Sequence, residues 1–237
     1  MNNLAIIPAR GGSKRLPRKN LLPVGGKPLI DYTLRAVVDS QYFNKIIFSS
    51  DDEEMLEYAN KFKEISAEKR ESRLAGDKVK VIDLVKEIAS RTEFDDFDQV
   101  GLFLPTCPFR KAQHVKEATQ LLEASDLSVV SVCPMIDPLQ LSLTIDENSN
   151  IINPHAILNP SPLVTGQTRS QDFKTYYRVN GGLYIAWLDQ FRAKENFFQG
   201  QVKGYVMSEL ESIDIDYKHD LDIANLLLEK NYIHSSL

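Results

Sequence analysis

The sequence predicts an α/β domain of the Rossmann-like kind, in which helices flank a mostly parallel sheet. Short apolar runs alternate with segments whose apolar residues recur every three or four positions, and this alternation is typical of parallel βαβ units. The length of 237 residues, with 43% hydrophobic and 26% charged residues, suits one such domain. A basic loop containing two glycines directly follows the first apolar run, at a place where sheets of this kind bind ligands.

The composition argues against several classes of function. The net charge is −5, so a nucleic-acid footprint spread over the domain is not indicated. The two cysteines, Cys107 and Cys133, are too few for a disulfide framework or a thiolate metal cluster. No apolar run approaches the roughly 18 residues that span a bilayer, and no leader segment is recognisable. We therefore expect a cytoplasmic protein without nucleic-acid or membrane partners.

The first predicted strand, Leu4–Ile7, leads into the basic loop. Gly11 and Gly12 allow a turn in which successive backbone N–H groups point at one anion. Five basic side chains surround this turn: Arg10, Lys14, Arg15, Arg18 and Lys19. The loop therefore predicts a ligand with several negative charges close together, such as a nucleoside triphosphate, although a solvated basic surface is an alternative. Its spacing fits neither the Walker loop nor the dinucleotide fingerprint.

Two further βα units follow the loop in the prediction. A helix extends from Pro28 to Ser40, a strand covers Lys45–Ser50, and a second helix ends near Phe62. Asp51 and Asp52 precede the second helix, where acids favour the positive helix end; metal binding is the alternative role. Residues 63–80 contain many charges and few apolar residues, so we expect an exposed loop there.

The alternation continues and then stops. We expect a helix at 80–90, a strand at 100–104, a helix at 112–123 and an apolar strand at 127–133. From 134 to 177, scattered prolines and polar runs predict an extended excursion with a short hairpin. We interpret this excursion as an insertion in a single domain that spans residues 1–237.

The end of the chain is predicted to contain short strands at 183–187, 204–207 and 212–215 and a helix at 217–230. In the last strand Asp214 and Asp216 would project from one face, so their carboxylates could share a hard cation such as Mg²⁺. A helix cap is the alternative for Asp216. The four histidines show no metal-ligand spacing, and we expect them to be ordinary surface or core residues.

Several motifs occur in a recognisable order. Residues 7–14 read IPARGGSK, Lys19-Asn20 follow, and residues 26–30 read GKPLI. Later come PTCPFR at 105–110, RVNGGLYI at 178–185 and IDID at 213–216. This order resembles the acylneuraminate cytidylyltransferases, the CMP-sialic acid synthetase family. The resemblance implies a nucleotidyltransferase fold and transfer of CMP from CTP to an acidic α-keto sugar, with release of pyrophosphate.

The resemblance also implies a nucleotide site and a catalytic set. CTP would be bound by Ala9, Arg10, Gly11, Gly12, Ser13, Lys19, Asn20 and Arg70. Arg10 and Lys19 would stabilise the α-phosphate and the leaving pyrophosphate, and Asp214 and Asp216 would hold Mg²⁺. These four residues are the implied catalytic residues. No side chain stands out as a general base.

The arginine of the nucleotide site belongs to a motif that departs from the family pattern. Arg70, Leu74, Ala75 and Asp77 resemble R-P-x-x-L-A-x-D, but Glu71 stands in place of the proline. Arg73 is therefore a rival for the role of phosphate ligand. Pairing of both arginines with neighbouring glutamates, at little energetic gain, is the alternative.

The implied sugar site departs from the family as well. Leu104 stands where the family has glutamine, and Gln140 replaces a sugar-binding lysine, so the sugar can differ from sialic acid. Arg169 and Arg178 are expected to bind the sugar carboxylate, and Asn180 to hydrogen-bond hydroxyl groups. In proteins that this chain resembles, the excursion shapes the sugar pocket and reaches a second subunit, so we expect a homodimer.

Two alternatives remain open at this point. The chain could be a 3-deoxy-octulosonate cytidylyltransferase, whose opening motif is similar, or a non-catalytic nucleotide-binding protein of the same fold. Retention of Arg10, Lys19, Asp214 and Asp216 favours an enzyme. Lys14 and the Lys19-Asn20 pair favour a nine-carbon sugar acid over the octulosonate.

Overall fold

The structure is a computed structural model that describes residues 1–76, 79–148, 151–152 and 162–233. The chain divides into two compact units, one formed by residues 1–132 and 179–237 and the other by residues 133–178. Each unit is described by itself. Asp77, part of the predicted arginine motif, lies outside the described residues.

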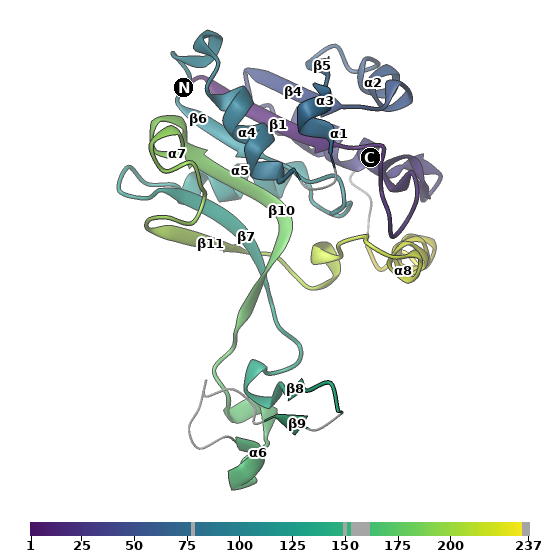
Figure 1. The fold of residues 1–237 in the computed structure, drawn as a ribbon, viewed down its shortest axis with the longest axis vertical. Coiled ribbons are helices and arrows are strands. Elements are labelled where there is room, and N and C mark those ends of the chain that lie inside the picture. Colours follow the sequence, from purple (N-terminus) through teal and green to yellow (C-terminus); the bar gives the residue numbers. More distant parts are fainter. Residues whose placement is uncertain (77–78, 149–150, 153–161, 234–237) are drawn as a thin grey trace. The chain divides into compact units, whose positions relative to one another are not determined.

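The first unit is built on a seven-stranded sheet with the order β11-β7-β10-β6-β1-β4-β5 (Figure 1). Strand β1 lies between β4 and β6 and is parallel to both, whereas β10 is antiparallel to β6. The predicted mostly parallel sheet is therefore confirmed. The strands are β1 (Asn3–Ala9), β4 (Lys45–Ser50), β5 (Ile65–Lys69), β6 (Gln99–Leu102), β7 (Ser128–Pro134), β10 (Tyr177–Trp187) and β11 (Val202–Val206).

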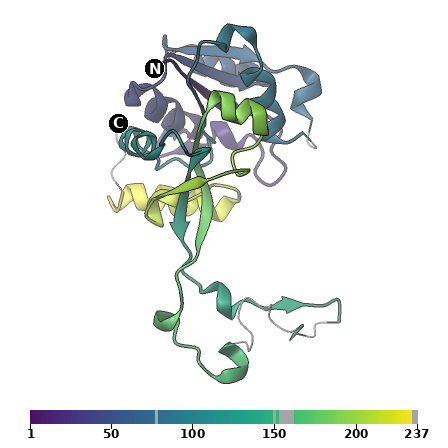
Figure 2. The same cartoon turned by 90° about the vertical axis from the view of Figure 1, so that its left-hand side faces the viewer.

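Helices cover both faces of this sheet (Figures 1 and 2). Alternate residues of β1 point to opposite sides, as the period of a strand requires. Ala5 and Ile7 pack with α1 (Leu29–Ser40), α2 (Glu53–Ala59) and α5 (Ala112–Leu121). Leu4 and Ile6 pack with α4 (Val81–Ala89) and α7 (Leu188–Lys194). Burial on both faces explains why β1 reads as a continuous apolar run.

A third apolar cluster holds the C-terminal helix α8 (Lys218–Glu229) against the basic loop. Leu221 and Ala224 of this helix pack with Leu16 of the loop and with Phe109, which follows β6. Ile215 is fully buried in the same cluster. A two-stranded ribbon of β2 (Pro23–Val24) and β3 (Lys27–Pro28) leads from the loop into α1.

Two of the predicted elements are wrong. Residues 63–80 are not simply a loop, because Ile65–Lys69 forms β5, an edge strand paired with β4, and Ser72–Ala75 forms the short helix α3. Pairing on one side only lets polar side chains remain accessible, and this conceals the strand in the sequence. Residues 212–215 do not form a strand either, since a 3-10 turn at Leu210–Ser212 precedes an extended segment without sheet pairing.

The unit of residues 133–178 contains little regular structure. Its hairpin pairs β8 (Thr144–Ile145) with β9 (Ile151–Ile152), as the sequence predicts. The helix α6 (Pro162–Thr165) and two 3-10 turns, Leu139–Leu141 and Ser170–Asp172, complete its described elements. Within the described ranges of both units, no helix is long and apolar enough to cross a membrane.

Candidate active site

A cleft of about 480 Å³ lies at the carboxyl ends of β1, β5 and β6 in the first unit. In parallel α/β sheets, ligands typically bind at this edge, in the crevice where the strand order reverses. The cleft brings together seven residues predicted from the sequence: Arg10, Ser13, Lys19, Asn20, Arg70, Leu104 and Asp216. Ala9, Gly11, Gly12, Asp214 and Asn180 are absent from its described lining.

The basic loop places its cations by a series of local turns. The amide of Ser13 donates to the carbonyl of Gly11 at 3.1 Å. Arg18 then adopts a left-handed backbone conformation, with φ of 53°, and a 3-10 turn begins at Lys19. Asn20 is buried, and its Nδ2 donates to the carbonyl oxygen of Arg10 at 3.2 Å. Asn20 therefore ties the two ends of the loop together beside the cleft.

Lys19 and Asp216 form the central ion pair of the cleft. The Nζ of Lys19 lies 2.7 Å from Oδ1 of Asp216, and the lysine side chain is only 11% exposed. Arg15 pairs with the other carboxylate oxygen, and its guanidinium lies 5.2 Å from the ring centroid of Tyr217. Burial opposes ionisation of Asp216, but Lys19 and Arg15 outweigh it and hold the pKa of this carboxyl below its ordinary value.

Arg70 meets the cleft from the end of β5. Its Nη2 donates to the carbonyl of Ser49 at 2.7 Å, and its amide donates to the carbonyl of Ser50 at 2.8 Å. Burial lowers the pKa of Arg70 without removing its charge at neutral pH. Arg73, the rival for its role, pairs with Glu71 at 2.6 Å through two largely exposed side chains and is not among the described lining residues. The structure therefore favours Arg70 as an anion ligand.

The predicted anion nest at Gly11 is corrected by the structure. The Gly11 amide donates to Oδ1 of Asp51 at 2.9 Å, so a carboxylate of the chain itself takes the place expected for a phosphate. Asp52 accepts from the Met55 amide at 3.2 Å and caps α2, which is the helix-capping role that the sequence favoured. A Cβ at Gly11 would lie 3.0 Å from Asp52, so this glycine serves close packing of the loop against α2.

Asp214 and Asp216 flank the fully buried Ile215 in the extended segment before α8. Asp214 is exposed and Asp216 is partly exposed, so both carboxylates point away from the core that Ile215 enters. The described residues contain no group of three or more histidine, cysteine or acidic side chains that could enclose a metal ion. A pair of carboxylates does fit Mg²⁺, which completes its octahedron with phosphate oxygens and water.

Asn180 lies in the interior and not in the cleft, which differs from its predicted role as a ligand of substrate hydroxyls. Its Oδ1 accepts from Ser131 at 2.5 Å and from the Gly182 amide at 3.0 Å, and its Nδ2 donates to Ser212 at 2.8 Å. These bonds and a longer contact with the sulfur of Met207 use the whole hydrogen-bonding capacity of the side-chain amide. Asn180 therefore connects β7, β10 and the turn before Asp214.

Three other residues of the predicted sugar site, Gln140, Arg169 and Arg178, belong to the unit of residues 133–178. Gln140 is buried there, and its Nε2 donates to the carbonyl of Lys174 at 3.0 Å, so it fastens the backbone of its own unit. Arg169 and Arg178 are exposed. Leu104 lies on the wall of the cleft in the other unit, where it presents an apolar surface.

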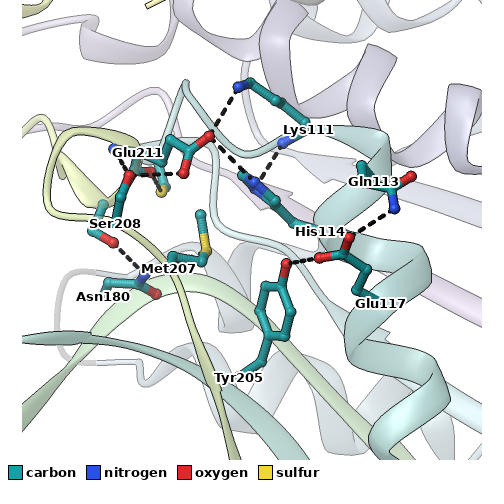
Figure 3. Close-up of polar contacts among 11 residues, drawn as sticks. Lys111, Gln113, His114, Glu117, Asn180, Tyr205, Met207, Ser208 and Glu211 are labelled. Carbon is teal, nitrogen blue, oxygen red and sulfur yellow. Dashed lines mark hydrogen bonds and ion pairs between the residues drawn. The ribbon is translucent and has the colours of Figure 1, made fainter.

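Two residues near the site were missed by the sequence analysis. Arg110 is 2% exposed, and its guanidinium donates to the carbonyls of Leu104 and Gly182 and to the hydroxyl of Thr33. Glu211 contacts Lys111 and His114 (Figure 3). Apart from Leu104, these partners lie more than 70 positions away in the sequence, so no local pattern indicates the contacts. The one signal was that Arg110 closes the PTCPFR motif.

Comparison with known proteins places this cleft in context. The family model described as cytidylyltransferase matches residues 4–234. The CMP-N,N'-diacetyllegionaminic acid synthase of Legionella pneumophila is 32% identical over 98% of both chains. The pseudaminic acid cytidylyltransferase of Campylobacter jejuni is 28% identical over 98% of both chains. An N-acylneuraminate cytidylyltransferase of Streptococcus agalactiae is 31% identical over 93% of this chain, which spans 52% of that relative.

Solved structures support the fold. A CMP:2-keto-3-deoxy-manno-octonic acid synthetase in complex with CTP superposes with a TM-score of 0.70 at 16% identity, over 98% of this chain and 100% of the other. At this identity the likeness shows the nucleotidyltransferase fold alone. The family model and the full-length relatives confirm the resemblance found in the sequence motifs: the chain belongs to the cytidylyltransferase family, in the group that includes the N-acylneuraminate, legionaminic acid and pseudaminic acid enzymes.

Proposed function

We propose that this protein transfers CMP from CTP to a nine-carbon acidic α-keto sugar of the sialic, legionaminic or pseudaminic class and releases pyrophosphate. The observation that carries the proposal is the cleft in which Arg10, Lys19 and Arg70 line one space with Asp216. Such a set of cations together with a carboxylate suits a triphosphate and its metal ion. The relatives named for these sugars extend over nearly the whole chain.

The reaction joins a hydroxyl oxygen of the sugar to the α-phosphorus of CTP and breaks the bond from that phosphorus to the oxygen that bridges to the β-phosphate. The proton of the hydroxyl is lost, and the electron pair leaves with pyrophosphate. The protein mainly positions two anions and stabilises the charge that grows on the leaving group. We assign this stabilisation to Arg10 and Lys19, with Ser13, Asn20 and Arg70 binding other parts of the nucleotide.

We propose Asp214 and Asp216 as the residues that hold Mg²⁺. Bound there with the triphosphate, Mg²⁺ would supply charge neutralisation at the phosphates. Asp216 is ionised at all pH values near neutrality, because its pKa is below the ordinary carboxyl value. Lys19 and Arg15 occupy its two oxygens in the structure, so metal binding requires these cations to turn toward the phosphates or to share the carboxylate.

The proposed sugar site must bind a carboxylate and discriminate among the other groups of the sugar. Arg169 and Arg178 are exposed and suit a carboxylate, which an arginine binds through two parallel hydrogen bonds. Gln140 and Asn180 are buried and bonded to their own units, so we now assign them a structural role. Leu104 would favour an apolar part of the sugar, such as an acetamido methyl group or a deoxy carbon.

We also propose that the protein acts as a homodimer in the cytoplasm. The unit of residues 133–178 supports a dimer, because it presents apolar side chains that a second subunit would cover. Ile136, Ile145 and Val164 are 74%, 66% and 75% exposed. CTP is a cytoplasmic metabolite, and this accords with the location expected from the sequence.

The experiment that tests the function is release of pyrophosphate in the presence of Mg²⁺. The four common nucleoside triphosphates are each combined with N-acetylneuraminic, N,N'-diacetyllegionaminic, pseudaminic and 3-deoxy-octulosonic acids. We expect turnover with CTP and one nine-carbon acid. Turnover with the octulosonic acid would move the protein to that substrate class. CTP binding without turnover on any acid would support a non-catalytic nucleotide-binding protein.

A further inference from the structure

The segment between β11 and α8 carries two proposed metal ligands although it has little regular structure. Residues 207–217 carry Asp214 and Asp216, yet apart from one 3-10 turn they form no helix or strand. Sheet pairing does not fix the position of the two carboxylates. Their position must therefore come from the contacts that individual residues of the segment make with the rest of the first unit.

Asp216 pairs with Lys19 and Arg15 of the basic loop, and Glu211 makes the ionic contacts that join this segment to the start of α5. Its Oε1 accepts from Nζ of Lys111 at 2.8 Å and lies 3.4 Å from Nε2 of His114 (Figure 3). Its Oε2 accepts from the hydroxyl of Ser208 at 2.7 Å. The carboxylate is 22% exposed and the histidine 10%, so these contacts are partly shielded from water. Figure 3 shows Lys111 and His114 converging on the carboxylate from the start of α5.

The partners of Glu211 lie a few residues after the chain segment that forms one wall of the cleft. Leu104, Pro105 and Thr106 line the cleft, and Lys111 precedes the first residue of α5. Two further bonds join the same stretches of chain. The thiol of Cys107 donates to the carbonyl of Glu211 at 3.5 Å, and the amide of Ile215 donates to the carbonyl of Thr106 at 2.8 Å.

The histidine is oriented for this contact by the backbone. Its Nδ1 accepts from the Lys111 amide at 3.2 Å, so the neutral ring carries its proton on Nε2, which faces Glu211. Glu117, on the same helix, accepts from the hydroxyl of Tyr205 at 2.5 Å and from Gln113 at 2.7 Å. Glu117 thus joins α5 to β11, and among the described residues no hydrogen bond or ion pair joins it to residues 207–217, so the cluster offers a second carboxylate for comparison.

We propose that Glu211 is a positioning residue for the reaction: its carboxylate, held by Lys111 and His114, fixes the segment of Asp214 and Asp216 against the wall of the cleft. This inference rests on the proposed function of the two aspartates. Partners that orient metal-binding groups typically change metal affinity or activity about 10- to 100-fold when they are removed. A displacement of about 1 Å at a reacting group can have an effect of similar size.

A purely structural role for Glu211 makes a different prediction. Partly exposed ion pairs contribute little to stability, and shielded pairs can often be replaced without loss. A contact that only stabilises the 3-10 turn would also depend on Ser208, whose hydroxyl accepts from the Glu211 amide at 3.3 Å. Two substitutions, Glu211→Gln and Lys111→Met, test the contact with α5. A third, Ser208→Ala, tests the local turn.

The first measurement is amide hydrogen exchange of residues 213–216 by mass spectrometry, on the full chain without ligands. The Ile215 amide bonded to Thr106 is the reporter. We expect about tenfold faster exchange in Glu211→Gln and in Lys111→Met, the wild-type rate in Lys111→Arg, and no change in the control Glu117→Gln. Unchanged exchange in Glu211→Gln would overturn the proposal. Faster exchange in Ser208→Ala alone would assign the effect to the turn.

The second measurement is the Mg²⁺ concentration that gives half-maximal turnover of CTP with the accepted sugar. We expect this concentration to rise about 10-fold in Glu211→Gln and Lys111→Met, while the KM for CTP changes less than threefold. Glu117→Gln should behave as the wild type. If exchange accelerates but the Mg²⁺ requirement is unchanged, positioning for the reaction is disproved. If the wild type does not turn over CTP, the proposed function fails, and we then apply the exchange test alone to the anchoring of the segment.

Discussion

Lys19 is a nearly buried cation, and within the described residues Asp216 is the acidic side chain that pairs with it. Its ammonium lies 2.7 Å from Asp216, and the side chain is 11% exposed, so few waters solvate it. A nearly buried ammonium with one carboxylate partner retains donors for a second anion. Its position in the cleft beside Arg10 makes the phosphates of a nucleotide the natural second partner. Lys19 is therefore the residue whose removal should affect the reaction most directly.

Lys19→Met should lower kcat/KM for CTP by about 10²- to 10³-fold, the usual effect of removing one donor to a developing negative charge. The fold should persist, because methionine fills similar space. The measurement is steady-state pyrophosphate release together with the thermal midpoint. Lys14→Met is the matched control, since Lys14 also lines the cleft from the same loop. Equal losses in both variants would show that the loop acts only through its total charge.

At the scale of elements, Arg110 connects three parts of the first unit. Its guanidinium donates to Thr33 of α1 at 2.5 Å, to Leu104 after β6 at 3.2 Å and to Gly182 of β10. Burial lowers the pKa of this guanidinium to about 10, which still leaves it charged at neutral pH. Within the described chain, its hydrogen-bond acceptors are two carbonyls and a hydroxyl, and no carboxylate forms an ion pair with it. The charge is therefore stabilised by carbonyl dipoles, a hydroxyl and the ring of Phe103, 5.5 Å away.

Arg110→Lys should destabilise the protein by about 2–4 kcal/mol, because the single nitrogen of a lysine cannot reach all the acceptors that the wide, planar guanidinium spans and would leave buried acceptors unpaired. Urea unfolding at pH 7 measures this loss. Arg73→Lys is the control, since Arg73 forms an exposed pair with Glu71 and should change stability by less than about 0.5 kcal/mol. If Arg110→Lys lost no more stability than the control, the guanidinium of Arg110 would not connect these elements as described.

His114 should make the stability of the α5 region depend on pH. Burial lowers its pKa below the ordinary 6.5, and the opposing charge of Glu211 does not compensate. As the pH falls, the unfolded chain therefore binds this proton before the folded chain does. The stabilisation is present above about pH 6.5 and is lost as the pH falls through the lower pKa of the folded state.

His114→Asn should therefore lose less stability than the wild type between about pH 7 and pH 5. Asparagine keeps an acceptor for the Lys111 amide. Urea midpoints across this range measure the slope, and His219→Asn, at an exposed histidine, should retain the slope of the wild type. An unchanged slope in His114→Asn would mean that other groups determine the acid sensitivity.

At the scale of the whole molecule, the two units differ in how they bury apolar side chains. The first unit has three apolar clusters around its sheet. The unit of residues 133–178 contains short elements and exposes Ile136 and Val164 almost fully. Exposed aliphatic side chains of this kind are costly in a monomer and are typical of interfaces. A second copy of the chain is the partner that the proposed homodimer would supply.

The double variant Ile136→Asp and Val164→Asp should convert the dimer to a monomer, because each new carboxylate would lose its water in the interface. Light scattering after size exclusion measures the mass. Leu226→Asp on α8, whose side chain is 51% exposed, is the control and should remain dimeric. A wild-type protein that is monomeric at micromolar concentration would contradict the proposed assembly.

The sequence by itself determined the class of fold and the order of most elements. Apolar periodicity and glycine positions are local signals, and they located β1, α1, β4, α4, α5 and α8 but not the helix α7. They failed at the edge strand β5 and at the segment before α8, where pairing and side-chain contacts decide the conformation. The ordered motifs also predicted the family, which the comparisons confirm.

The tertiary structure alone decided which charged groups meet. Lys19 and Asp216 are 197 positions apart, and Gly11 meets Asp51 across 40 positions, so neither contact follows from spacing. The same holds for Asn180 and Gln140, whose polarity suggested ligands but whose burial assigns them to internal bonds. Local propensity fixes the elements along the chain, whereas the partner of a charge depends on how distant elements pack. That packing brings Arg10, Lys19 and Arg70 together with Asp216 in one cleft.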